Sequence, residues 1–166
     1  IPDPETVTDW DNERTFRVTS YNGDAREYAY KVVKSEIESD GDVELKTTEE
    51  VASFAATKTT VVKGNLIIGS DAEEAEKITD ISALASLKEV TGNIVIRNSY
   101  NGADLTGLDN IVSAGGLQVG STDVASKATE LHMISMKALE TLSGDISVYN
   151  DQVTYVLFEK LATIEG

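Results

Sequence analysis

The sequence predicts a mainly β protein in which short parallel strands stack as a solenoid, preceded by an N-terminal β-hairpin. Three observations support this fold class. A glycine followed by a short alternating apolar segment recurs along the chain. Apolar residues at three-residue steps precede Gly92, Gly144 and Gly166, and also Gly116, one residue after the glycine that the spacing marks. Near the N-terminus, an Asn-Gly pair separates two alternating runs, which is typical of a hairpin.

The predicted hairpin consists of RTFRVTS at 14–20 and REYAYKVV at 26–33, with Asn22-Gly23 between them. An isolated hairpin is only marginally stable in water. We therefore expect it to pack on the solenoid, on sequence outside this chain, or on another chain. The acidic, glycine-containing segment at 35–42 predicts a linker after it.

The recurring segments are spaced by 28, 23, 29 and 22 residues, measured between their glycines. Periods of about 20–30 residues with one short strand each indicate a solenoid. We expect each glycine to form a corner that a Cβ would obstruct. We also expect the extra residues of the two longer repeats to form loops at 69–83 and 120–137. The glycines are Gly64, Gly92, Gly115, Gly144 and Gly166.

The apolar side chains of each repeat are expected to face inward, because stacked coils can bury each other's apolar sides. In the strands, alternate residues face inward: Leu66 and Ile68, Ile94 and Ile96, Leu117 and Val119, Ile146 and Val148. Before the strands, the three-residue step fits a tight 3₁₀-like coil: Leu84, Leu87 and Val90; Leu108, Ile111 and Ala114; Met136, Leu139 and Leu142; Phe158, Leu161 and Ile164.

The segments LASLKEVTGNIVIRN at 84–98 and LTGLDNIVSAGGLQVGS at 105–121 resemble the receptor L domain. That family forms a leucine-rich-repeat-like, right-handed parallel β-helix in insulin and growth-factor receptor ectodomains and in many Bacteroidetes surface proteins. The resemblance covers residues 43–166 and implies an incomplete last coil. It also implies one short capping helix near the start, where Thr47 and Glu50 have the spacing of a capping box. The cysteine-rich modules that flank such receptor domains have no counterpart here.

Residues 1–36 resemble the closing strands of an immunoglobulin-like module of Bacteroidetes secreted proteins, with a tryptophan before the last two strands. The expected domains are therefore the C-terminal strands of such a module, or a hairpin extension, over 1–36, and the receptor-L-domain-like solenoid over 43–166.

The net charge of −15 disfavours nucleic acid and anionic membrane as partners. Cysteine is absent, which excludes disulfides and thiolate metal sites.

No apolar run reaches the roughly 18–20 residues that cross a bilayer. The resemblance implies a bacterial cell-surface, secreted or periplasmic location, and a lipid anchor would lie outside this sequence.

No cluster of residues with obvious chemistry is found, so we expect no catalytic residues, no bound metal and no cofactor. His132 is the only histidine, and no nucleophile motif accompanies it. DWDNE at 9–13 lacks the glycine and the distant glutamate of a calcium loop. DAEEAE at 71–76 is interpreted as a solvated loop or a helix start.

The outward side chains of the predicted sheet are the candidate ligand-binding residues, because solenoids commonly bind through such a face. The apolar pair Ile67 and Val95 has three interpretations: a contact site, a surface covered by the hairpin, or ordinary exposed residues. Arg97 and Tyr149 are of the types enriched at binding hot spots. The candidate residues are Asn65, Ile67, Asn93, Val95, Arg97, Gln118, Asp145, Ser147 and Tyr149.

The resemblance implies a non-enzymatic adhesion or recognition module that binds a protein or glycan ligand at the cell surface. One alternative is a structural spacer that displays another domain. A second alternative, a polysaccharide-degrading β-helix enzyme, is disfavoured because the predicted face has only Arg97 and Asp145 as charged groups.

Overall fold

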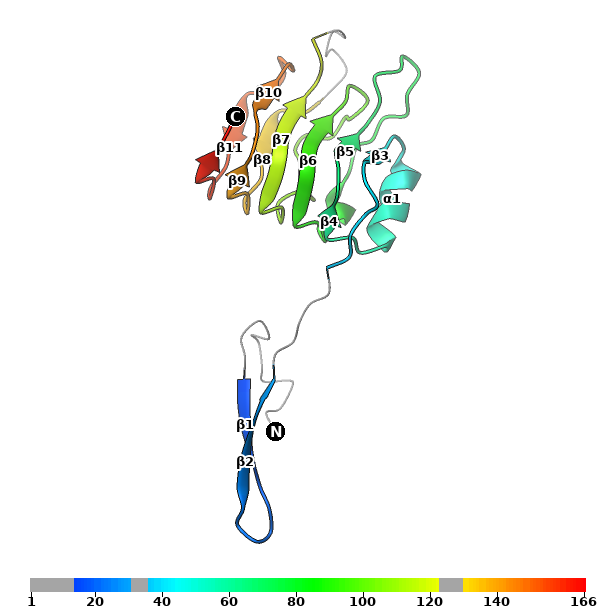
Figure 1. Cartoon of the computed structure of the whole chain (residues 1–166). Helices are drawn as coiled ribbons and strands as arrows, with labels where there is room; N and C mark the ends of the chain where they lie inside the picture. The colour runs from blue at the N-terminus through cyan, green and yellow to red at the C-terminus, as the bar shows by residue number, and fades with distance from the viewer. Residues whose placement is uncertain (1–13, 31–35, 123–129) are drawn as a thin grey trace. The chain divides into compact units, whose positions relative to one another are not determined.

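The computed structural model describes residues 14–30, 36–122 and 130–166. The chain divides into two compact units, residues 1–35 and 36–166 (Figure 1). Over the described residues the protein is mainly β, with one α-helix and one large sheet of parallel strands.

The first unit contains the predicted hairpin. Strand β1 (Arg14–Thr19) pairs in antiparallel register with β2 (Ala25–Tyr30). Gly23, in the connecting loop, has φ of +87°, a conformation that glycine adopts without steric cost. Phe16 and Tyr28 are direct cross-strand partners, and their rings stack with centroids 5.4 Å apart. The hairpin prediction is confirmed.

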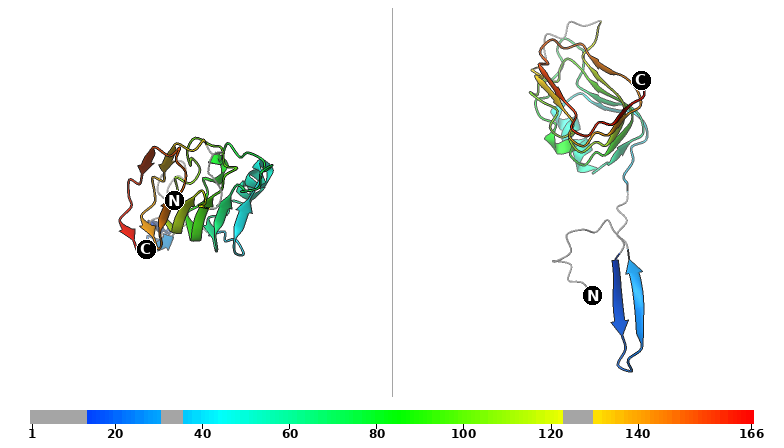
Figure 2. Two further views of the ribbon diagram at one scale, coloured as in Figure 1. Left: turned by 90° about the horizontal axis from the view of Figure 1, so that it is seen from above. Right: turned by 90° about the vertical axis from the view of Figure 1, so that its left-hand side faces the viewer.

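The second unit is built on a parallel sheet whose strands lie side by side (Figure 2). The strand order is β12-β9-β7-β6-β5-β3, with β4 also paired to β6 and β10 to β7, while β8 and β11 form a separate parallel pair. The bounds are β3 Val43–Leu45, β4 Val61–Val62, β5 Leu66–Ile68, β6 Glu89–Ile96, β7 Ser113–Val119, β8 Met133–Ser135, β9 Thr141–Leu142, β10 Ile146–Val148, β11 Tyr155–Leu157 and β12 Thr163–Ile164.

The recurring glycines lie within or between strand segments, where the backbones of successive repeats approach closely. A Cβ added to Gly92 would lie 2.7 Å from the carbonyl carbon of Gly64, and one on Gly115 would lie 2.6 Å from the carbonyl oxygen of Gly92. A Cβ added to Gly144 would lie 2.7 Å from the carbonyl oxygen of Gly115, and one on Gly166 would lie 2.6 Å from the carbonyl carbon of Gly144. The prediction that a Cβ is excluded is confirmed. The predicted corner is wrong for Gly92 and Gly115, which lie inside β6 and β7, whereas Gly64 and Gly144 lie at bends between two strands.

The sheet begins one strand earlier than the glycine spacing predicted. Strand β3 pairs in parallel with β5. Just before it, Gly41-Asp42 repeats the Gly-Asx pair found at Gly144-Asp145, a sequence signal that could have revealed this first strand. The Ser39 N–H donates to the Val61 carbonyl at 3.0 Å. The linker prediction therefore does not hold for residues 36–42, which belong to the sheet unit.

Helix α1 (Thr48–Ala56) begins with the predicted capping box. The Glu50 N–H donates to Thr47 Oγ1 at 3.1 Å, and the Thr47 N–H donates to Glu50 Oε2 at 3.2 Å. The helix buries Val51 and Ala55 and contacts β3 and the 3₁₀ turn η1 (Ser82–Leu84). The capping box confirms the helix start predicted from the sequence.

Replacing Thr47 with alanine is expected to lower the free energy of unfolding by about 1 kcal/mol, because one N–H of the first helical turn loses its acceptor. Urea unfolding followed by circular dichroism measures the change. Ser53→Ala, at an exposed position of the same helix, is the control and is expected to have little effect. Equal stability of the two variants would contradict a structural role for the cap.

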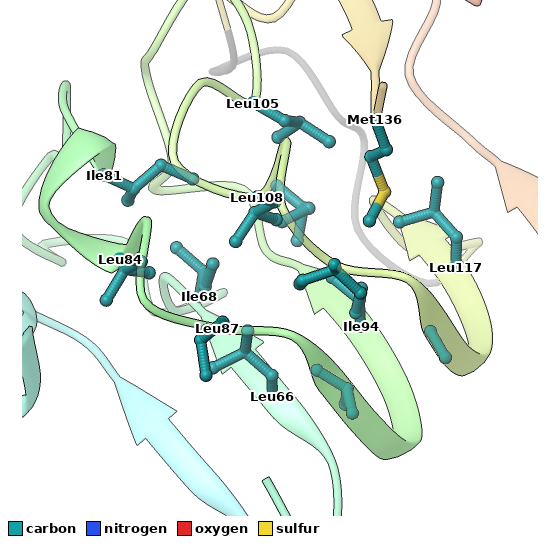
Figure 3. Close-up of a cluster of buried hydrophobic side chains, with 14 of the residues drawn as sticks. Leu66, Ile68, Ile81, Leu84, Leu87, Ile94, Leu105, Leu108, Leu117 and Met136 are labelled. Carbon is teal, nitrogen blue, oxygen red and sulfur yellow. The ribbon is translucent and has the colours of Figure 1, made fainter. Parts of the chain in front are cut away.

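The core runs along the inside of the repeats (Figure 3). The nine apolar residues predicted at three-residue steps before Gly92, Gly116 and Gly144 are at most 4% exposed. The inward residues of β5, β6 and β7 are equally buried. The last repeat differs, because Val148 is 38% and Ile164 is 52% exposed. Among the described strands, none pairs with the outer side of β10 or β12, which accounts for this exposure.

Candidate functional site

The structure brings all nine candidate residues onto one face of the large sheet, which we call the sheet face. Parallel register aligns β5, β6, β7 and β10, and the alternate residues of β5, β6 and β7 point into the core. The candidates form three rows across the strands: Asn65, Asn93 and Asp145; then Ile67, Val95, Gln118 and Ser147; then Arg97 and Tyr149.

The first row begins with side-chain hydrogen bonds between strands. The Asn65 N–H donates to Asp42 Oδ1 at 2.7 Å, and the Asn93 N–H donates to Asn65 Oδ1 at 2.8 Å. The Asn65 backbone N–H, and then its side-chain Nδ2, which donates to Asp42 Oδ1 at 3.2 Å, lower the pKa of Asp42. Asp42 and Asn65 therefore stabilise strand stacking, and sequence reasoning missed this partnership because it did not recognise β3.

The apolar pair of the second row is less exposed than the sequence predicted. Val95 is only 8% exposed and Ile67 is partly buried, although both side chains lie on the outer side of the sheet. The interpretation as ordinary exposed residues is therefore wrong for Val95. The interpretation as a surface covered by the hairpin stays a prediction.

Arg97 of the third row is tied to the loop that follows β5. Its Nη1 lies 2.8 Å from Asp71 Oδ2, and Asp71 Oδ1 also accepts the Asn98 N–H at 3.1 Å. Glu76, in the same loop, accepts the Thr48 N–H at 2.9 Å. The segment DAEEAE is therefore more than a solvated loop, and two of its acids hold it to the sheet and to α1. Tyr149 is 45% exposed at the end of β10.

A hollow of about 330 Å³ lies on the sheet face, over the part of β7 that follows Gly116. Gly116 stands opposite Asn93 in the register, so the first row has no side chain at β7. Asn93, Gln118, Asp145 and Ser147, which are four of the candidate residues, line the hollow together with Leu117 and Gly144.

The same part of the chain carries a family likeness. Residues 58–125 match the model of the receptor L domain family. The match covers β4 to β7, the strands that form the centre of the sheet face. Receptor L domains are binding domains and not enzymes, so the match supports a ligand-binding module. No curated protein and no solved structure matches the chain.

Outside the receptor L match, the described contacts of His132 are with one backbone carbonyl and one exposed carboxylate. Its Nδ1 lies 3.2 Å from the Gln152 carbonyl oxygen, its Nε2 lies 3.8 Å from Glu130 Oε2, and the side chain is exposed. Over residues 14–30, 36–122 and 130–166, no group of three or more acidic or histidine side chains is placed to hold a metal ion. The acidic segment at 9–13 lies outside the described residues. No helix within these ranges is long and apolar enough to span a bilayer.

The stability of the sheet unit is expected to fall in acid. Hydrogen bonds from the backbone N–H groups of Asn65, Thr48 and Ser82 lower the pKa values of Asp42, Glu76 and Asp80, respectively, in the folded state. The unfolded chain then binds more protons than the folded chain as these groups titrate. The highest ordinary pKa among the three groups is that of Glu76, 4.5. Their stabilising contribution is present above that pH and is lost as the pH falls through the lowered pKa values of the folded state.

Urea unfolding between pH 6 and pH 2.5 measures this effect, and the midpoint is expected to decrease below about pH 4. Glu76→Gln keeps an oxygen acceptor for the Thr48 N–H but removes one titrating group. Its midpoint should therefore decrease less steeply than that of the wild type. A wild-type midpoint that stays constant down to pH 2.5 would contradict the assignment.

Proposed function

We propose that the protein is a non-enzymatic recognition module that binds a protein or glycan ligand with the sheet face. The hollow carries this proposal, because it gathers side chains from β6, β7 and β10 at one place, and its β6 and β7 residues lie in the stretch that matches a binding family. We also propose that residues 43–166 form a right-handed solenoid of a bacterial surface, secreted or periplasmic protein. In this proposal the hairpin is the end of an immunoglobulin-like module of the Bacteroidetes type.

Ligand binding through an extended, regular face is consistent with the physics of stacked repeats. Such a face is rigid where a buried core lies behind it, as behind β5, β6 and β7, so a ligand does not have to order it. Two features keep the face open. Gly116 contributes no side chain, and Arg97 is held by Asp71 at its edge.

The test is a binding screen of the purified chain on an array of glycans and extracellular-matrix proteins. Val95→Arg places a long cation at the centre of the sheet face and is expected to abolish a saturable hit. The matched control is Val156→Arg on β11, an exposed position in the other sheet of the same unit, which should leave binding unchanged. Thermal unfolding of both variants checks that each is folded.

A hit that Val95→Arg retains would place the ligand elsewhere and contradict the proposal. No hit at high protein concentration would favour the spacer that displays another domain. Arg97→Ala is a less direct probe, because it also frees the Asp71 loop. Tyr149→Ala removes an exposed ring from the end of the same face and is the preferred second variant.

A further inference from the structure

The hollow on the sheet face, which we call the trough, lies over β7 between β6 and β10. Gly116 leaves the outward position before Gln118 without a side chain, and Gln118 lines the floor. Asn93 from β6 stands on one side, and Ser147 from β10 stands on the other. A volume of about 330 Å³ is at the lower end of the range for small-molecule sites.

The lining of the trough is polar but has little charge. It offers two carboxamides, one hydroxyl and the carboxylate of Asp145. The Gln118 Nε2 donates to the Gly120 carbonyl at 3.0 Å, which holds the amide along the strand. A carboxamide has further donor and acceptor capacity for a ligand. A ligand that matches this lining carries many uncharged hydrogen-bonding groups.

The surrounding charge argues against an anionic ligand. Residues 36–166 contain 22 acidic and 9 basic side chains. On the outward positions of β5, β6, β7 and β10, the basic group is Arg97, and Asp71 already neutralises it at 2.8 Å. A polyanion would therefore meet repulsion without a compensating cation.

An aromatic ring completes the set of groups. Tyr149 directly follows β10 and stands two residues after Ser147, so the alternation of the strand places it toward the same face. Its side chain is 45% exposed. Tyrosine combines a flat apolar surface with a polar tip. A pyranose ring presents C–H groups on one face and hydroxyl groups around its rim. Its apolar face suits the tyrosine ring, and its hydroxyl groups suit the amides and the carboxylate of the trough.

We propose that the trough binds a neutral oligosaccharide, with Tyr149 as the stacking platform and Asn93, Gln118, Asp145 and Ser147 as hydrogen-bonding partners. This inference rests on the proposed function and specifies its ligand class. A protein ligand on the same face is the competing outcome.

The test uses titration calorimetry of the full chain with cellohexaose, laminarihexaose, maltohexaose, xylohexaose and mannohexaose, and with a heparin hexasaccharide as the anionic comparison. At least one neutral hexasaccharide is expected to bind saturably, at least tenfold more tightly than the heparin fragment. Tyr149→Ala should weaken binding about tenfold or more, whereas Tyr149→Phe, which keeps the ring, should weaken it much less. Gln118→Ala should weaken binding by about threefold to tenfold, the effect of one or more lost hydrogen bonds.

Tyr155→Ala is the matched control, because Tyr155 is an exposed tyrosine on β11 in the other sheet. It should bind like the wild type. Absence of binding by all five neutral hexasaccharides at millimolar concentration would overturn the inference, and so would binding that Tyr149→Ala and Gln118→Ala both leave unchanged. If a matrix protein binds instead and Val95→Arg abolishes that binding, the ligand class is wrong but the proposed function stands. If Val95→Arg abolishes no binding of any kind, both fail.

Discussion

Replacing Leu87 with alanine is expected to destabilise the sheet unit by about 2–5 kcal/mol. Leu87 is fully buried in the core cluster, between the 3₁₀ turn η1 and strand β6. The truncation removes apolar contacts and leaves a cavity that neighbouring repeats cannot fill without moving their backbones, which the stacked strands hold in register. Urea unfolding followed by far-ultraviolet circular dichroism measures the loss.

The control for this variant is Val112→Ala. Val112 lies just before β7 and its side chain is exposed, so little apolar burial is lost. We expect a change below about 1 kcal/mol, as for most exposed sites. Similar losses for Leu87→Ala and Val112→Ala would contradict the inward orientation of the three-residue steps.

Replacing Gly92 with alanine is the second change expected to have a large effect, about 3 kcal/mol, at the upper end for overpacking. The added Cβ would lie 2.7 Å from the Gly64 carbonyl carbon and 2.8 Å from the Asn65 backbone nitrogen. These are backbone atoms, so no rotation of a side chain relieves the contact. The strands β5 and β6 would have to separate, which weakens their pairing.

The matched control is Thr91→Val, one residue earlier in the same strand and exposed to solvent. It preserves the shape of an exposed side chain, so its unfolding midpoint should stay near that of the wild type. A Gly92→Ala protein as stable as Thr91→Val would contradict the close approach of successive repeats at their glycines.

Local pattern was sufficient to predict the hairpin, the capped helix and most of the core. Alternation and the three-residue step are properties of a short segment, and they determine which side of that segment is apolar. Leu84, Leu87 and Val90 could therefore be assigned to the core before any neighbour was known. Val148 was assigned in the same way and is exposed, because its burial depends on a strand beyond β10.

Contacts between repeats could not be predicted from the same patterns. The partner of Arg97 is Asp71, which is 26 residues away in a segment that looked like a solvated acidic loop. The role of Asn65 depends on Asp42, which lies 23 residues earlier, directly before the strand β3 that the pattern did not reveal. The hollow depends on Gly116 aligning with Asn93, which follows a register shift between Val90 and Asn93. Each of these features requires the alignment of successive strands in space.

A ligand site on the sheet face is tested most directly by hydrogen–deuterium exchange of the chain with and without the best-binding partner from the screen. We expect slower exchange in peptides that cover residues 92–98, 115–121 and 144–150, the strand segments bordering the hollow. Exchange in α1 and β11 should be unchanged. Protection confined to α1, to β11 or to the loop at 69–77, with no change in the three strand segments, would contradict a ligand site on the sheet face.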